Sequence, residues 1–333
     1  MPFKDFFPTE AIAEIIAHTR GRRGSVFTPL VTLKTFIFQV LSNDGSCQRA
    51  VGYVLAERLS QGQPANSVNT GPYCKARSRL PLRAIRQAVK NVGMRLHQQM
   101  PKAWLWQDYR VVLLDGTTLL MQNHAQKKTD FRRGKKLGQQ RDHVVAWQKP
   151  KRKPVWLSGQ AYAELPQEIG VREFAVAGRV YITTLAADKT CPKQELAALY
   201  QSRWKIELDF RTLKTHMGMD MLRCKTAEMV KKEIAVNLLA YHLIRGNMAQ
   251  AAILGNKIPR QISFRSAVQF ISEITTDFLK GNGKTLQSLL LGILKAIASV
   301  PIGRQKRKRQ PRAVKRRPKA YQLLTVPRYE VVV

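Results

Sequence analysis

Acidic residues are scarce in this chain of 333 residues. Asp and Glu number 22 against 57 Lys and Arg, which leaves a formal net charge of +35 at pH 7. Such an excess repels itself strongly unless a polyanion shares the surface. Nucleic acid is the first polyanion to consider, and an anionic membrane is the second. The start of the chain, Met1 to Asp5, lacks the basic-then-apolar layout of a secretion signal, so no export is expected.

A long hydrophobic run is also missing. The most apolar late stretch, Leu286 to Val300, is interrupted by Lys295 and is shorter than the roughly 20 apolar residues that cross a bilayer. We therefore expect a packed amphipathic helix there. No membrane partner is predicted.

Closely spaced cysteines are missing as well. The sequence has four cysteines and no C-x-x-C pair: Cys47, Cys74, Cys191 and Cys224. This spacing predicts neither a zinc site nor a disulfide framework. A reducing cytoplasm fits such a chain.

The hydrophobic content of 44% is ordinary for a globular protein, so the chain is expected to fold. Residues 1–100 show helical patterning, with start signals at Thr28-Pro29 and Leu80-Pro81. Two helices are expected within this stretch, Ser46 to Ser60 and Ser67 to Arg79. The second carries Tyr73, Lys75, Arg77 and Arg79 and could read DNA in a helix-turn-helix-like way, or it could be a solvated basic helix on a bundle.

The pattern changes after Arg110. Val111 to Leu114 is a short apolar run that predicts a buried strand, and it ends in the turn Asp115-Gly116-Thr117-Thr118. Eleven Lys or Arg and two acids then lie between Gln126 and Lys153, interspersed with aromatic residues. Short alternating segments predict a β-rich basic module here: His143 to Trp147, Arg172 to Val176, and Val180 to Leu185.

Helices are expected at Cys191 to Met217, Ala227 to Ala251 and Thr285 to Val300. The composition changes again in the C-terminal tail. Gly303 to Ala320 holds ten basic residues and no acid, with prolines that break any helix. It predicts an extended or disordered arm that binds phosphates non-specifically.

Leu196 to Lys214 is the most informative segment. On an ideal helix, four of its residues share one narrow stripe: Tyr200, Arg203, Glu207 and Lys214. Beside the stripe lies an apolar seam that should dock on a sheet, and Asp209 falls on the far side. A surface ion pair between Arg203 and Glu207 is an equally simple interpretation, because these residues stand four apart on a helix.

The spacing Y-x2-R-x3-E-x6-K resembles the signature of the insertion sequence four family of bacterial transposases, and it matches without a mismatch. Other segments are similar to the same family: Asp115-Gly116-Thr117-Thr118, the block Thr129 to Gly134, and the run Gly218 to Thr226. The likeness covers most of the chain from Arg110 to Met248 and the terminal stretch from Pro311 to Thr325. The sequence is therefore identified as similar to the DDE-type transposases.

This resemblance implies a ribonuclease-H-like core in which two aspartates and one glutamate hold two divalent metal ions, Mg²⁺ or Mn²⁺. Such a metal pair activates a water or a 3′-hydroxyl and stabilises the leaving oxygen during phosphoryl transfer. By resemblance Asp115 and Glu207 are the first and last ligands. The expected DNA contacts are Tyr200, Arg203 and Lys214 of the signature and Arg132, Arg133, Lys135 and Lys136 of the basic block.

The sequence departs from the family between the two carboxylates. The strands and helix that should carry a second aspartate are absent, and Leu119 to Gln122 runs almost directly into the basic block. We therefore expect an internal deletion near Leu119 to Met121, and with it a defective enzyme. Three hypotheses stay open: a competent transposase in which Asp142 or Asp188 replaces the missing ligand, a DNA-binding remnant that inhibits intact enzyme, and a decayed product that does not fold stably.

The expected fold class is mixed α/β, with an incomplete ribonuclease-H-like core, a β-rich basic insertion and flanking helical regions. Four segments follow: a helical N-terminal DNA-binding domain at 1–100, a catalytic core at 101–217 with its insertion at about 125–185, a helical region at 218–302, and a basic tail at 303–333. The expected partner is the double-stranded DNA of transposon terminal repeats, with a homodimer on DNA left open. The expected location is the bacterial cytoplasm, in association with the nucleoid.

Overall fold

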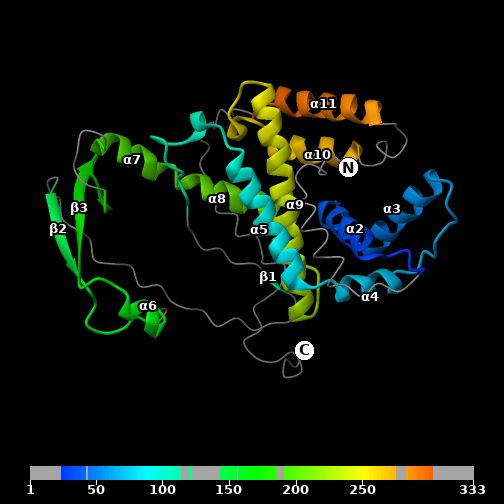
Figure 1. Ribbon diagram of the computed structural model, residues 1–333, viewed down its shortest axis with the longest axis horizontal. Helices are drawn as coiled ribbons and strands as arrows, with labels where there is room; N and C mark the ends of the chain where they lie inside the picture. The colour runs from blue at the N-terminus through cyan, green and yellow to red at the C-terminus, as the bar shows by residue number, and fades with distance from the viewer. Residues whose placement is uncertain are drawn as a thin grey trace, which may run out of the picture. The chain divides into compact units, whose positions relative to one another are not determined.

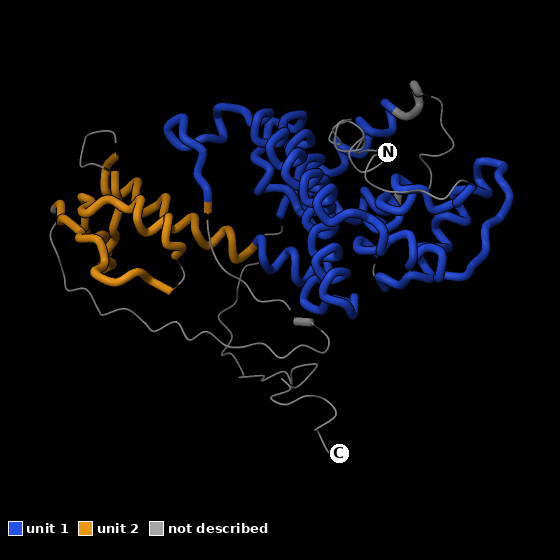
Figure 2. Tube along the Cα trace, turned by 60° about the horizontal axis from the view of Figure 1, so that its bottom comes forward, with its two compact units in different colours: residues 1–112, 116–125, 209–333 blue, residues 113–115, 126–208 orange. Residues whose placement is uncertain are grey.

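The computed structural model describes residues 24–42, 44–113, 120–121, 143–155, 157–185, 191–274 and 283–302. These residues mix helices with short strands and divide into two compact units (Figure 2). The first unit holds 24–112, 120–121 and 209–302, and the second holds 113 and 143–208. The four segments expected from the sequence are a functional division, which the packing units do not test. They remain a prediction.

Four helices begin the first unit, and their starts follow from local sequence. In α2, Pro29–Leu41, the Thr28 side chain caps the helix by accepting from the Val31 amide. In α3, Cys47–Ser60, Ser46 does the same for the Arg49 amide. Helix α4 spans Gly71–Arg79 and α5 spans Leu82–Gln98, the latter beginning after Pro81. The predicted helix starts at Thr28 and Ser46 are thus confirmed, and α4 begins four residues later than expected.

Helix α9, Ala227–Leu254, is the central element of this unit. Fifteen of its 28 residues are buried, which means that other elements cover it on most sides. Helices α2, α5, α10 (Phe264–Ile274) and α11 (Gly283–Ser299) pack against it (Figure 1). Leu239, Leu243 and Ile244 are fully buried at the centre of this core. Helix α11 confirms the packed helix expected at 285–300, whereas α10 was not predicted.

Short elements complete the first unit. Strand β1, Leu120–Met121, pairs in parallel with β5, Met221–Leu222. Two short 3-10 helices lie at Lys102–Trp104 and Pro259–Gln261. A second apolar cluster packs α3 against α4 through Val51, Val54 and Tyr73, and Val31 and Phe38 of α2 pack against it.

The second unit contains a three-stranded antiparallel sheet in the order β2, β3, β4. The strands span His143–Gln148, Glu168–Val176 and Arg179–Thr183, and α6 spans Gly159–Ala163. Helix α7, Lys193–Gln201, packs on β3. Phe174 and Leu196 are among the buried residues of this unit. The β-rich module expected from the alternating segments is confirmed.

One expectation about the chain before the sheet is wrong. Val111 and Val112 form no strand and have exposed fractions of 40% and 63%, because no described segment pairs with them. DNA reading by α4 stays a prediction, but Tyr73 does not lie on its surface. Tyr73 is fully buried, and its hydroxyl donates to Gln39 at 2.8 Å, so its side chain belongs to the helix core.

No helix in the described ranges is long and apolar enough to cross a membrane.

Candidate nucleic-acid interface and signature helix

The predicted site residues fall into two groups. Asp115, Arg132, Arg133, Lys135 and Lys136 lie outside the described residues, as do the substitute ligands Asp142 and Asp188. Tyr200, Arg203, Glu207 and Lys214 are described. The structure therefore describes all four residues of the signature.

The segment from 191 to 217 is not the single continuous helix expected from its spacing. Helix α7 ends at Gln201, and α8 spans Trp204–Arg211. Between them, the Arg203 amide donates to the Tyr200 carbonyl at 2.9 Å, and the Ile206 amide donates to the Arg203 carbonyl at 3.0 Å. These are bonds between residues three apart, which tighten the backbone and interrupt the regular helix.

A second irregularity lies after Glu207. Residues Thr212–His216 form a π-helical turn in which the Met217 amide donates to the Thr212 carbonyl at 3.2 Å. A π-turn inserts one extra residue into the helical repeat. The uniform angular spacing that placed Lys214 on the stripe of Glu207 therefore does not hold across this turn.

The apolar seam of the signature is less buried than expected. Leu196 and Ala197 of α7 are buried against the sheet, but no residue of α8 is fully buried. Tyr200 is 60% exposed and meets the ring of Tyr181 edge-on, with centroids 5.5 Å apart. The side chain of Tyr200 is thus largely accessible while its ring contacts the sheet.

Arg203 and Glu207 form an ion pair. Arg203 Nη2 lies 3.1 Å from Glu207 Oε1, and the side chains are 40% and 36% exposed. A pair this exposed contributes little to stability, on the order of a few tenths of a kcal/mol. Both side chains therefore keep access to solvent and to a ligand.

Asp209 has a role that the helical spacing did not predict. It was expected on the far side of the helix, but its side chain is only 19% exposed. Oδ1 accepts from Arg245 at 2.7 Å, and Oδ2 accepts from Arg260 at 2.7 Å. Arg245 lies against the rings of Tyr241 and Phe264, 5.1 Å from each centroid. This cluster attaches the end of α8 to α9 and to the residues just before α10.

Residues 122–243 match the family described as Transposase DDE domain. This stretch contains all four signature residues. It is therefore similar to the DDE-type transposases.

Curated relatives support the same assignment. The transposase InsG for insertion sequence element IS4 of Escherichia coli is 29% identical over 143 residues, which cover 42% of this chain and 32% of the relative. The transposase for insertion sequence element IS421 of Escherichia coli is 40% identical over 68 residues, or 20% of this chain and 18% of the relative. The matches thus span a third or less of these relatives. No solved structure matches significantly.

DDE transposase domains generally use divalent metal ions. In the part of the chain that the structure describes, no group of three or more His, Cys, Asp or Glu side chains could hold one. Glu207 is the one predicted ligand within that part, and its Oε1 is engaged by Arg203. Because Mg²⁺ needs several oxygen ligands, the described residues alone do not supply a metal centre.

Proposed function

We propose that this chain binds the DNA ends of an insertion sequence through a DDE transposase domain and that its own cleavage and strand transfer are impaired. The match of residues 122–243 to the Transposase DDE domain carries this proposal. The exposed side chains of Tyr200 and Arg203 add to it, because an aromatic ring and a guanidinium are groups that contact nucleotides and phosphates.

The N-terminal helices offer cations of their own to DNA. On α4, Lys75 and Arg79 are exposed, whereas Tyr73 is buried and Arg77 is half-buried. Side chains such as Lys75 and Arg79 neutralise phosphates without reading the sequence of bases. In this proposal the N-terminal domain positions the DNA.

Impaired chemistry follows from the sequence between the two predicted carboxylates. The proposed core is ribonuclease-H-like, and the internal deletion near Leu119 to Met121 removes the segment of its second aspartate. Glu207 is meanwhile paired with Arg203. Two carboxylates do not supply the ligands that a two-metal centre requires.

The decisive experiment combines binding and cleavage. Fluorescence anisotropy should show tighter binding to a duplex that carries the terminal repeat of the chain's own element than to a shuffled duplex. Neither Mg²⁺ nor Mn²⁺ should then produce cleaved ends. Cleavage that is lost in Glu207→Ala would instead establish a competent enzyme. Absence of both DNA binding and cooperative thermal unfolding would indicate a decayed product.

A matched pair of variants tests the signature directly. Arg203→Ala should weaken binding to the terminal repeat about tenfold, because one charge-assisted phosphate contact is lost. Arg211 is exposed on the same helix but lies outside the signature, so Arg211→Ala should change affinity much less. Equal losses in both variants would mean that only net charge matters.

A further inference from the structure

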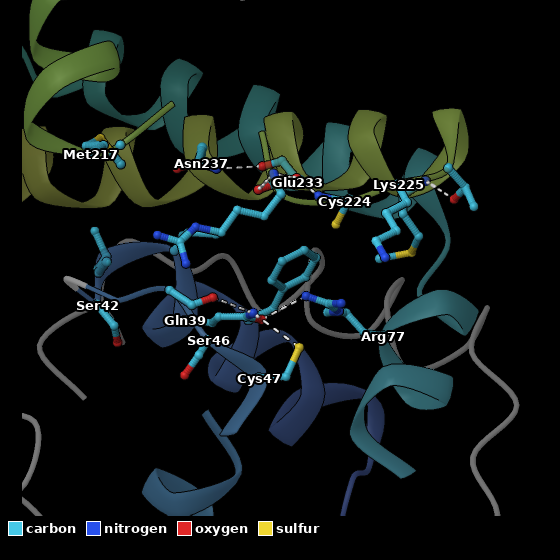
Figure 3. A pocket seen from close by; sticks show the side chains of 18 of the residues that line it. Gln39, Ser42, Ser46, Cys47, Arg77, Met217, Cys224, Lys225, Glu233 and Asn237 are labelled. Carbon is cyan, nitrogen blue, oxygen red and sulfur yellow. Dashed lines mark hydrogen bonds between the residues drawn. The ribbon is translucent and has the colours of Figure 1, made fainter. Parts of the chain in front are cut away.

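A cavity of about 560 Å³ lies within the first unit, and the π-turn that ends the signature segment borders it through Thr215 and His216. Helices α2, α3 and α4 line one side, and the chain from β5 into α9 lines another (Figure 3). Gln39 and Arg77 face it from the N-terminal helices, and Glu233 and Asn237 face it from α9. The volume is typical of a site for a small molecule.

The charges around this cavity are unbalanced. Three cationic side chains line it: Arg77, Arg223 and Lys225. Glu233 is the one acidic lining residue, and its oxygens accept from the backbone amides of Arg223 and Cys224 at 2.9 to 3.1 Å. In the described part of the chain none of the three cations forms an ion pair with a carboxylate. The cavity therefore favours an anionic ligand.

Arg77 is held in place without an anion. Its guanidinium lies 4.8 Å from the ring centroid of Phe36 and 5.4 Å from that of Tyr73. Nη1 donates to Gln39 Oε1 at 2.9 Å, and the buried Nε has no hydrogen-bond partner in the described structure. A half-buried guanidinium that is oriented in advance and lacks a counter-ion is suited to bind a phosphate.

Asn237 adds an unsatisfied acceptor. Its side chain is 3% exposed, and its Nδ2 donates to the Glu233 carbonyl at 2.9 Å. Its buried Oδ1 has no partner. Leaving such a group unpaired costs about 1–3 kcal/mol, so a ligand that donates a hydrogen bond would be favoured here.

We infer that this cavity binds a nucleotide, with the phosphate near Arg77, Arg223 and Lys225. A nucleotide combines an anionic group with hydrogen-bond donors, and its size suits the cavity. The choice of a nucleotide among organic phosphates rests on the proposed DNA-binding function. A free mononucleotide and the phosphorylated end of a DNA strand share this chemistry, and the test separates them.

Cys47 supplies a reporter inside the cavity. It is half-buried and lines the cavity, whereas the half-buried Cys191 belongs to the other unit. Full-length protein is pulsed with iodoacetamide, and the labelling of each cysteine is measured by peptide mass spectrometry. Deoxyadenosine monophosphate and a 5′-phosphorylated duplex are the two probes, with deoxyadenosine and an unphosphorylated duplex as controls. A probe at ten times its dissociation constant should slow Cys47 labelling about tenfold and leave Cys191 unchanged.

Exposed cations provide variants that should still fold. Lys225→Gln and Arg223→Gln should each raise the probe concentration for half-protection about three- to tenfold, because each removes one phosphate contact. Lys231 is exposed on α9 and does not line the cavity, so Lys231→Gln should leave protection unchanged. If all three variants change the concentration for half-protection equally, the cavity is not the binding site.

The outcomes separate this inference from the proposed function. Protection by the mononucleotide alone assigns the cavity to free nucleotides, and protection by the phosphorylated duplex alone assigns it to a strand end. If Cys47 labelling is unchanged with both probes but anisotropy shows DNA binding, the cavity is not a nucleotide site and the proposed function still holds. If the mononucleotide protects Cys47 but the protein binds no DNA, the cavity is a nucleotide site and the proposed function is wrong.

Discussion

His242 is a half-buried base with a defined partner. Its Nδ1 lies 3.2 Å from the Val89 carbonyl oxygen, so Nδ1 carries the proton. Burial lowers the pKa of His242 below 6.5, because the charged ring is poorly solvated, and the Val89 bond opposes this only in part. The folded state thus binds a proton less readily than the unfolded state.

Because the pKa of His242 differs between the folded and unfolded states, the stability of the protein depends on pH. Because the folded pKa is lowered, the stability from neutral His242 is present above pH 6.5 and is lost as pH falls toward the folded pKa. His242→Asn keeps a donor near Val89 and removes the titration. We expect its melting temperature to fall less than that of the natural protein between pH 8 and pH 5. Parallel pH curves for the two proteins would contradict this.

Asp209 is the shared anion of two arginines. Asp209→Asn should lower the free energy of unfolding by about 1–3 kcal/mol, because Arg245 loses its counter-ion in a partly buried place. Arg260 is 41% exposed, so Arg260→Ala should cost less than about 1 kcal/mol. Urea unfolding measures both. If the two variants cost the same, Arg245 is not the main partner.

At the scale of the element, α9 places polar side chains in the core. Asn247 is fully buried, its Nδ2 donates to the Leu243 carbonyl at 2.9 Å, and its Oδ1 has no partner. Asn247→Leu has a similar volume and removes the unsatisfied oxygen. It should raise the free energy of unfolding by about 1 kcal/mol, measured by urea denaturation. Leu243→Ala, which opens a cavity beside it, should instead lower it by about 2–5 kcal/mol.

The signature helix shows what spacing can and cannot predict for an element. The stripe of Tyr200, Arg203 and Glu207 assumes a regular helix, and sequence spacing does identify the ion pair of Arg203 with Glu207. The break before Trp204 and the π-turn at Thr212–His216 are invisible to a fixed angular repeat. They change the direction of the Lys214 side chain, although its spacing from Glu207 in the sequence still matches the signature.

At the scale of the whole molecule, the net charge of +35 governs association with DNA. The logarithm of the DNA association constant should fall linearly with the logarithm of salt concentration, with a slope of about −0.9 per neutralised phosphate. Lys75→Gln should reduce the magnitude of that slope by about one. Lys295 is exposed on α11, outside the expected DNA-binding segment, so Lys295→Gln should not change it. A slope near zero for the natural protein would contradict phosphate binding.

The sequence by itself determined the features that depend on residues a few positions apart. Caps at Thr28 and Ser46, the strands of the basic module, the overall charge and the transposase signature all follow from such local patterns. Each depends on hydrogen bonds within one turn, on alternation along one strand, or on composition.

Only the tertiary structure decided which distant side chains meet. Asp209 finds Arg245 and Arg260, 36 and 51 residues away, and the cavity joins Arg77 to Glu233 and Asn237. The run at Val111 has every local mark of a strand and still forms none among the described residues. Strand pairing, counter-ions and cavities require a partner from elsewhere in the chain, and local patterns do not specify that partner.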